Sequence, residues 1–169
     1  MTTPIATSTP FQDLDQYIAL PRLGGLALSL DGTRLVVVMN VLDPKRTRYV
    51  TSLWEVDPQG ERAARRLTRS AKGESNAAFL PDGSLLFVSA RPDPAAASDD
   101  ADEPKSALWR LPAGGGEAGV VATRPGGVGG VVVARDSGTI VVSSDTLPGS
   151  VTAEDDATRR ALSLRIDLP

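Results

Sequence analysis

The chain contains no cysteine and no histidine among its 169 residues. Without cysteine it can form no disulfide, no thiolate metal site and no cysteine nucleophile. Without histidine it lacks the imidazole that takes the serine proton in a Ser-His-Asp triad, and it lacks a common zinc ligand. The sequence therefore excludes serine-triad hydrolysis and a conventional zinc site within this chain, and it indicates no cofactor.

Long apolar runs and a strong net charge are also absent. No stretch approaches the roughly 20 apolar residues of a membrane-spanning helix, and the first ten residues lack the basic start and apolar core of a secretory signal. The formal net charge is −3, from 18 basic and 21 acidic residues, which provides no broad positive field. We expect a cytoplasmic protein that binds neither nucleic acid nor membrane.

A turn motif occurs three times, in the segments SLDGTRLVVV, LPDGSLLFVS and ARDSGTIVVS at residues 29–38, 80–89 and 134–143. Each copy places a two-residue Asp-Gly or a three-residue Asp-Ser-Gly between two apolar runs, which is a strong hairpin signal. Gly32 and Gly83 accept the positive φ that such a turn needs, and Asp31 and Asp82 tolerate it. The motif predicts three hairpins.

The spacing of these hairpins indicates a repeat. Gly32 and Gly83 lie 51 residues apart, Gly83 and Gly138 lie 55 apart, and Trp54 and Trp109 also lie 55 apart. A period near fifty residues built from short strands is in the range of propeller blades. We therefore predict an all-β fold, an incomplete β-propeller of about two and a half to three four-stranded antiparallel blades, with a short N-terminal helix.

The domain organisation follows from this repeat. We expect a disordered N-terminus at 1–10, a short helix and lead-in at 11–22, and a partial propeller at 23–169 with blades near 23–68, 74–123 and 128–169. Asp13 is placed to cap a helix over 13–20, and Pro21 prevents its continuation. This helix either packs on the rim of the propeller or holds a second domain.

The period-2 patterns predict the individual strands. They fall at 26–30, 34–41, 51–56 and 64–67 in blade one, at 77–79, 85–89, 107–111 and 120–122 in blade two, and at 131–134 and 140–144 in blade three. After an acidic linker at 154–156, the segment 161–169 alternates apolar Leu162, Leu164, Ile166 and Leu168 with polar or small residues, and predicts a third strand. Because the chain then ends, we expect an incomplete blade with an unprotected edge.

Two sets of charged residues are candidates for a site. A basic cluster between two strands of blade one contains Lys45, Arg46 and Arg48. This cluster is either a ligand site or a solvated hairpin tip. Glu74, in KGESN, is expected to be a solvated residue leading into blade two.

An acidic loop and two glycine runs complete the candidates. Asp99, Asp100, Asp102 and Glu103 could hold calcium loosely, but the spacing is not that of an EF-hand, so a mobile surface loop is the simpler interpretation. The runs at 114–116 and 126–130 lack the Gly-Lys-Ser/Thr and helix of a phosphate cradle, and we interpret them as turns between crowded strands. We therefore assign no catalytic, cofactor-binding or metal residue.

The order of these motifs resembles a known family. The segments at 11–38, 52–69, 72–92 and 106–122, with a tryptophan in each third strand, are similar to the N-terminal propeller of prolyl oligopeptidase family serine peptidases from bacteria. The acylaminoacyl-peptidase and dipeptidyl-aminopeptidase branch is the most similar, over about residues 11–160. The resemblance implies a propeller that caps an α/β-hydrolase domain. The serine elbow of that domain is absent here, and Glu74 stands alone where such propellers use a glutamate pair.

The resemblance leads to a functional expectation. We expect a non-catalytic portion of a serine peptidase, present as a fragment or a prematurely ended reading frame, that gates the access of short peptides to a missing hydrolase domain. An alternative is a TolB-like propeller scaffold for protein-protein interaction, and a third interpretation is a small ligand-binding β-sandwich. Self-association through the open blade edges is a further expectation, because each blade needs neighbours.

Overall fold

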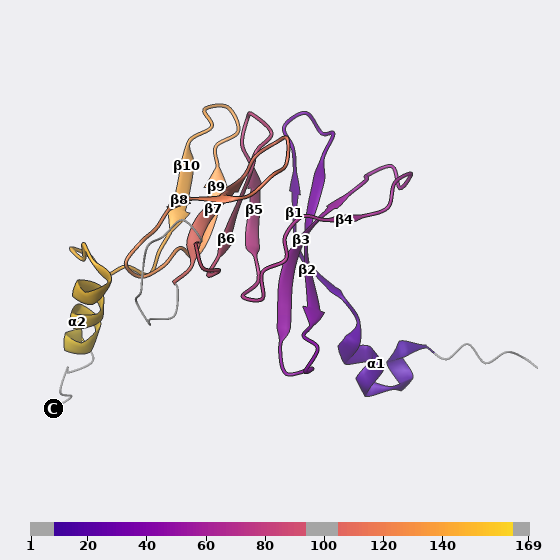
Figure 1. Ribbon diagram of the computed structural model, residues 1–169, viewed down its shortest axis with the longest axis horizontal. Coiled ribbons are helices and arrows are strands. Elements are labelled where there is room, and N and C mark those ends of the chain that lie inside the picture. Colours follow the sequence, from indigo (N-terminus) through magenta and orange to yellow (C-terminus); the bar gives the residue numbers. More distant parts are fainter. Residues whose placement is uncertain (1–8, 94–104, 164–169) are drawn as a thin grey trace, which may run out of the picture.

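The computed structural model describes residues 9–93 and 105–163. Three antiparallel sheets lie side by side (Figure 1). Sheet A contains β1 (Arg22–Leu28), β2 (Leu35–Leu42), β3 (Tyr49–Val56) and β4 (Arg65–Arg66) in that order. Sheet B contains β5 (Ser75–Phe79), β6 (Leu85–Ser89), β7 (Ala107–Leu111) and β8 (Gly119–Ala122), and sheet C pairs β9 (Gly130–Val133) with β10 (Ile140–Ser143).

The first strand of each sheet lies next to the first strand of the following sheet. β1 contacts β5, and β5 contacts β9. Within every sheet the strands follow one another in sequence order, so the later strands of sheets A and B lie progressively farther from this row. Sequential antiparallel sheets with their first strands together are the arrangement of consecutive propeller blades. The predicted incomplete propeller is confirmed, with sheets of four, four and two strands.

The core consists of two layers between the three sheets. All residues of β6 are buried, and they alternate between the layers, as period 2 requires. Leu85 and Phe87 pack with Trp109 against sheet A, whereas Leu86 and Val88 pack against sheet C. Full burial of one such side chain contributes about 1.5 to 3 kcal/mol, so sheet B is stabilised on both of its faces.

The Asp-Gly turn of sheet A is longer than the two-residue loop that the sequence predicts. The Ser29 amide donates to the Arg34 carbonyl, and the Gly32 amide donates to the Ser29 carbonyl. Gly32 has a φ of 73°, as in a type I turn that ends in a left-handed glycine. The Asp31 carboxylate accepts hydrogen bonds from the Ser29 hydroxyl and from Thr33. These bonds, with that of Ser29 as the largest effect, lower the pKa of Asp31 to about 2.

The N-terminal helices pack against sheet A. α1 (Leu14–Ala19) follows the 3₁₀ helix η1 (Pro10–Gln12), and the Asp13 carboxylate accepts the Gln16 amide at 3.1 Å, the predicted cap. The Tyr49 hydroxyl donates to the Ile18 carbonyl at 2.6 Å. This contact supports packing on the rim of the propeller. Of the N-terminal segment predicted to be disordered, residues 1–8 lie outside the described residues.

The prediction for the segment after sheet C is wrong. Residues 154–156 were predicted as a linker and 161–163 as the start of a strand, but α2 (Ala153–Ser163) contains both. The Thr152 hydroxyl accepts the Asp155 amide at 3.1 Å and caps the helix. Ion pairs one turn apart, Asp155–Arg159 and Asp156–Arg160, stabilise it further. Residues 164–169, with the rest of the predicted strand, lie outside the described residues.

Within 9–93 and 105–163, none of the helices has the length and apolar character needed to cross a membrane.

Candidate functional site

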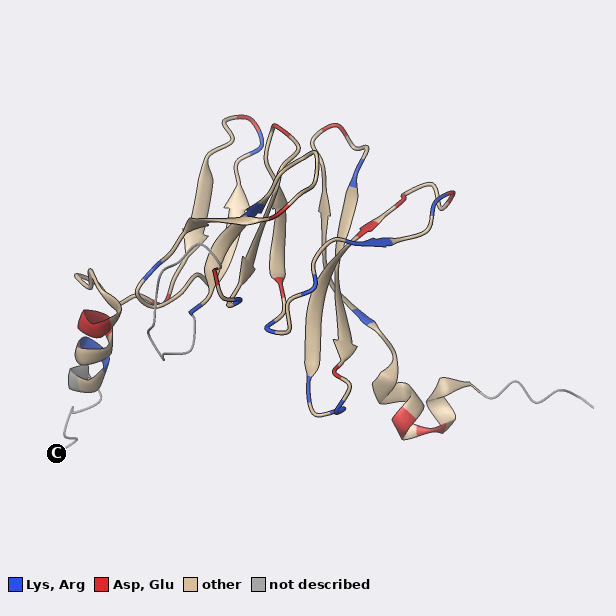
Figure 2. Cartoon of the chain, viewed as in Figure 1, with Lys and Arg blue, Asp and Glu red and all other residues tan. Residues whose placement is uncertain are grey.

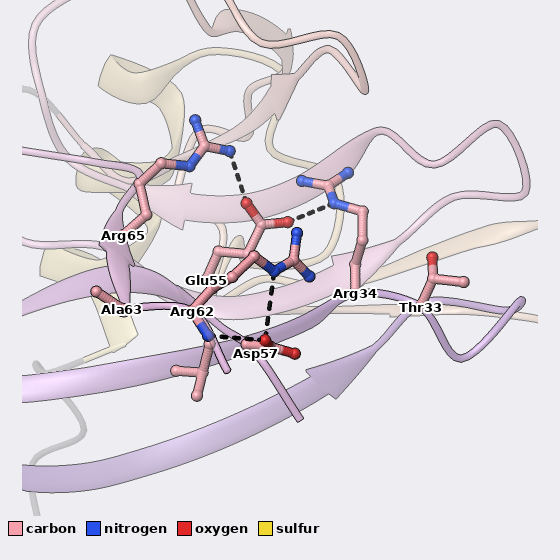
Figure 3. Close-up of a pocket in the computed structure, with 8 residues that line it drawn as sticks. Thr33, Arg34, Glu55, Asp57, Arg62, Ala63 and Arg65 are labelled. Atoms are coloured by element: carbon pink, nitrogen blue, oxygen red, sulfur yellow. Dashed lines mark hydrogen bonds and ion pairs between the residues drawn. The ribbon is translucent and has the colours of Figure 1, made fainter. Parts of the chain in front are cut away.

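A cleft of about 520 Å³ opens at the end of sheet A where β3 leads into β4 (Figure 3). We call it the arginine cleft, and its lining consists of Thr33, Arg34, Glu55, Val56, Asp57, Arg62, Ala63 and Arg65. Antiparallel pairing brings these residues together, because β3 pairs with β2 on one side and with β4 on the other.

Glu55 is the centre of the cleft. Its Oε1 accepts from Arg34 Nε and its Oε2 from Arg65 Nη2, each at 2.6 Å. Figure 3 shows this carboxylate between the two guanidinium groups. Arg34 also donates from Nη1 to the Gly83 carbonyl at 2.9 Å, so it links the cleft to the first turn of sheet B.

The environment of Glu55 keeps it ionised. Burial, the largest single effect, favours a higher pKa, but the hydrogen bonds and charges of Arg34 and Arg65 together outweigh it and lower the pKa. Near neutral pH the carboxylate is therefore an anion held between two cations.

Asp57 fixes the loop that carries Arg62. Its carboxylate accepts the Gln59 amide at 3.1 Å, the Arg62 amide at 3.0 Å and Arg62 Nε at 3.3 Å. The Gln59 amide and then the Arg62 side chain lower the pKa of Asp57. Arg62 itself points into the cleft (Figure 3), and 78% of its side chain is exposed.

A smaller cavity of about 160 Å³ adjoins the arginine cleft. It shares Arg34 and Arg65, and adds Arg66 and the glycines at 114–116. The Gly115 amide donates to the Pro112 carbonyl at 3.0 Å, so these glycines form a turn, as predicted. Four guanidinium groups and two carboxylates line the combined surface, which leaves an excess of positive charge.

The chemistry of this lining suits binding. Arginine stays protonated at all physiological pH values and offers five donors in a planar fork. Both carboxylates have lowered pKa values, so neither exchanges a proton near neutral pH. The cleft can therefore hold an anion by charge-assisted hydrogen bonds.

The predicted basic cluster lies elsewhere, and its members separate. Lys45 and Arg48 line a different groove, of about 510 Å³, together with Trp54. Arg46 donates to the Asp15 carbonyl at 3.0 Å, and Arg48 donates to the Ala71 carbonyl at 3.1 Å. These two arginines therefore bind the hairpin of sheet A to the backbone of α1 and to the loop that contains Ala71.

Glu74 is buried, so the prediction that it is solvated is wrong. Only 1% of its surface is exposed. Oε1 accepts the Ser70 amide at 2.9 Å, and no hydrogen bond to Oε2 exists within the described part of the chain. Burial raises the pKa of Glu74. The hydrogen bonds of Ser70 and Thr68 and the charges of Arg91 and Arg66 lower it, but burial outweighs them. The 70–73 turn folds this side chain inward, which its local sequence does not reveal.

The remaining candidates hold no site in the described residues. Asp99, Asp100, Asp102 and Glu103 lie outside them. The second glycine run is a crowded turn, as predicted, because a Cβ on Gly126 would lie 2.4 Å from the Thr146 nitrogen. In 9–93 and 105–163, no three Asp or Glu residues come together as a metal site would require.

Sequence reasoning missed the arginine cleft. Its two central arginines, Arg34 and Arg65, lie 31 residues apart and meet at Glu55 only through strand pairing. The available signal was the basic run ERAARRLTR at 61–69, whose cross-strand partner depends on a register that the sequence leaves open.

Of three comparisons with known proteins, one found a match. No family model matches the chain, and no curated protein matches it. Among solved structures, it is similar to "putative TolB from Agrobacterium tumefaciens", with 25% sequence identity and a TM-score of 0.38. That match covers 59% of this chain and 32% of the other, so the similarity spans about a third of that protein's length.

Proposed function

We propose that the chain is a non-catalytic β-propeller scaffold that binds an acidic segment of a protein partner in the arginine cleft. The supporting observation is that three guanidinium groups converge on one cleft whose two carboxylates are already paired. An incoming carboxylate adds to this network without displacing either acid.

The exposed donors support this proposal. The side chains of Arg62 and Arg65 are 78% and 68% exposed. Arg65 uses Nη2 for Glu55, and Arg62 uses Nε for Asp57, so each guanidinium has further N–H groups that can face solvent. A planar fork of this kind binds carboxylates in a bidentate manner.

A binding experiment tests the proposal with an octaglutamate peptide as the acidic segment and an octaglutamine peptide as the uncharged reference. We expect the chain to bind octaglutamate alone, and added salt to weaken the complex because screening shortens the range of exposed charges. Arg65→Ala and Arg62→Ala should each weaken binding about fivefold, since an exposed ion pair contributes at most about 1 kcal/mol.

Arg124→Ala is the matched control. This exposed arginine lies outside the cleft and donates to the neighbouring Thr123 carbonyl, and the substitution removes the same charge. Equal losses of affinity from Arg124→Ala and Arg65→Ala would indicate a general charge effect and contradict the cleft. Binding of octaglutamine as tight as that of octaglutamate would contradict an acidic partner.

The narrower function, the gating propeller of a serine peptidase, stays a prediction that rests on the order of the sequence motifs. Because the chain has no histidine, we expect the purified chain to show no turnover of aminoacyl or acyl-aminoacyl chromogenic substrates. Hydrolysis that a serine-directed reagent abolishes would contradict both functions, since it would place catalysis in this chain.

A further inference from the structure

A second groove, of about 510 Å³, lies on the face of sheet A that points away from sheet B. Trp54 pairs with Arg66 on β4, and Val50, four residues before Trp54, pairs with Val41 on β2. Cross-strand partners and alternate residues of a strand share one face of a sheet, so these four side chains lie together. Leu53, on the other face, packs in the core against sheet B. We call this cavity the Trp54 groove.

The floor of the Trp54 groove is apolar. The indole nitrogen of Trp54 donates to the Ser52 hydroxyl at 3.0 Å, which fixes the orientation of the ring. Trp54 and Val50 are half-buried, and Val41 is exposed. The other apolar residues of the lining are Leu42, Pro44 and Ala71. A mostly apolar cavity of this size is typical of small-molecule sites, which range from about 300 to 1,000 Å³.

Four cations and one acid surround this floor. The cations are Lys45 and Arg48 of the β2–β3 hairpin, Arg66 of β4, and Arg69 of the segment after β4. Figure 2 shows basic residues at the tip of the β2–β3 hairpin and on β4. The acid, Asp43, accepts the Thr47 amide at 2.8 Å and the Thr47 hydroxyl at 3.0 Å, so it is bonded within its own turn. The groove therefore has an excess of positive charge.

The cations of this rim have donors to spare. Arg48 donates from Nη2 to the Ala71 carbonyl at 3.1 Å, and Arg66 donates from Nε to the Thr68 carbonyl at 2.7 Å. Each guanidinium is held in place by one bond and keeps further N–H groups. In residues 9–93 and 105–163, neither Lys45 nor Arg69 uses its side chain in a hydrogen bond or an ion pair.

The groove offers few acceptors, in contrast to its many donors. The Ser52 hydroxyl accepts from Trp54, and the Ser70 hydroxyl accepts the Lys72 amide at 3.0 Å. A ligand rich in hydroxyl or amide donors, such as a sugar, would lose its hydrogen bonds to water without replacing them. The lining instead suits a ligand with an aliphatic body and an anionic end that only accepts hydrogen bonds.

We propose that the Trp54 groove binds a medium-chain aliphatic carboxylate, with its chain on the apolar floor and its carboxylate at the basic rim. The apolar floor provides the hydrophobic contact, and the four cations provide the charge complementarity. The Trp54 groove shares no lining residue with the arginine cleft, so the inference is independent of the proposed function.

Tryptophan fluorescence tests the proposal with decanoate, at concentrations below those at which it forms micelles. We expect a saturable change in emission from Trp54. Decanol and decyltrimethylammonium have the same chain without the negative charge and should bind about fivefold more weakly or less, and acetate should have no effect. Trp54→Phe should abolish the signal, because Trp109 is buried in the core. Decanol that binds as tightly as decanoate, or a signal that persists in Trp54→Phe, would overturn the proposal.

Lys45→Gln and Arg69→Gln each remove one cation from the rim. Each variant should weaken decanoate binding about two- to fivefold and leave decanol binding unchanged, a difference that a general loss of structure would not produce. Arg124→Gln is the matched control, because Arg124 is exposed outside the groove. It should keep the wild-type affinity. Equal losses in all three variants, or no loss in either groove variant, would contradict the site.

Thiol protection locates the ligand without removing a charge. The chain has no cysteine of its own, so Ala71→Cys provides a single thiol in the groove and Val121→Cys a single exposed thiol on β8, outside it. Decanoate should slow the reaction of iodoacetamide with the first thiol and not with the second. Equal protection of both or of neither would contradict the proposal. Protection of Ala71→Cys by octaglutamate but not by decanoate would assign the groove to an acidic protein segment instead.

Discussion

Glu74 is a buried residue whose surroundings disfavour the ionised form of its carboxyl group. Its carboxyl is buried near Arg66 and Arg91, yet it forms an ion pair with neither, and one oxygen accepts the Ser70 amide. A buried anion without direct pairing is costly, because water no longer solvates it. Glu74 is therefore held by the turn around it, and its protonation is coupled to folding.

Glu74 makes stability depend on pH. Because its folded pKa lies above the usual 4.5, the folded state binds the proton more tightly, and stability falls as pH rises from about 4.5 through the folded pKa. Glu74→Gln should remove this dependence, so the variant should be more stable than wild type at pH 7 and lose that advantage near pH 4. Urea unfolding of the wild type and of Glu74→Gln at both pH values measures this difference in stability.

Glu74→Ala separates the charge from the hydrogen bond. It leaves the Ser70 amide without its partner, and we expect a loss of about 1 to 3 kcal/mol. A Glu74→Gln variant that is less stable than wild type at pH 7 would show instead that attraction to Arg66 and Arg91 outweighs burial.

The turns of the sheets depend on glycine at single positions. Gly83, with a φ of 78°, closes the turn between β5 and β6, and its carbonyl accepts from Arg34. A Cβ there would lie 3.4 Å from the Ala113 Cβ, an ordinary contact, so the backbone angle alone determines the cost of substitution.

Gly83→Ala should lower stability by about 1 to 2 kcal/mol, the usual penalty for an L-residue in the left-handed region. Gly114→Ala is the matched control, because a Cβ there meets nothing within 4 Å and Gly114 is not among the glycines with positive φ. Denaturant unfolding of both variants measures the difference. Equal losses would mean that the turn tolerates a side chain.

α2 depends on its first turn. The Thr152 hydroxyl satisfies the Asp155 amide, and loss of such a cap costs about 1 kcal/mol. Thr152→Ala should therefore speed amide hydrogen exchange in α2 about fivefold while exchange in β6 stays unchanged. Thr152→Ser keeps the hydroxyl and should retain wild-type exchange, and equal acceleration in both variants would exclude the cap as the cause.

At the scale of the whole molecule, stability depends on packing between sheets. Trp109 is buried between sheets A and B, and its indole nitrogen donates to the Ser89 carbonyl at 3.1 Å. Trp54 occupies the corresponding place in sheet A, on the face that points away from sheet B, and is only partly buried. The same residue type at the same position in the repeat therefore has two different energetic roles.

Trp109→Ala should cost about 3 to 5 kcal/mol, a large share of the roughly 5 to 15 kcal/mol of a typical domain. Trp54→Ala should cost less than half as much, because Trp54 is only partly buried. Urea unfolding of the two variants measures the contrast. Similar losses would contradict the difference in burial between the two tryptophans.

Local patterns predicted most of the sheets but little of the site. β6 and β7 lie where the period-2 runs place them, and the other strands differ by a few residues at their ends. The alternation from Leu162 onward predicted a strand, and this prediction is wrong for residues 161–163. The capped first turn and the ion pairs at helical spacing stabilise the helix α2 there. The arginine cleft could not be predicted, because Arg34, Glu55 and Arg65 meet only when three strands pair in register.

The sequence by itself determined the blade repeat, the turn glycines and the exclusion of thiol and imidazole chemistry, because these follow from residue type and local spacing. Only the tertiary structure decided that Glu74 is buried, that three arginines share a cleft and that Trp54 is only partly buried. Each of these three features depends on contacts between segments that lie far apart in the sequence. Burial and charge pairing arise only when the fold brings those segments together.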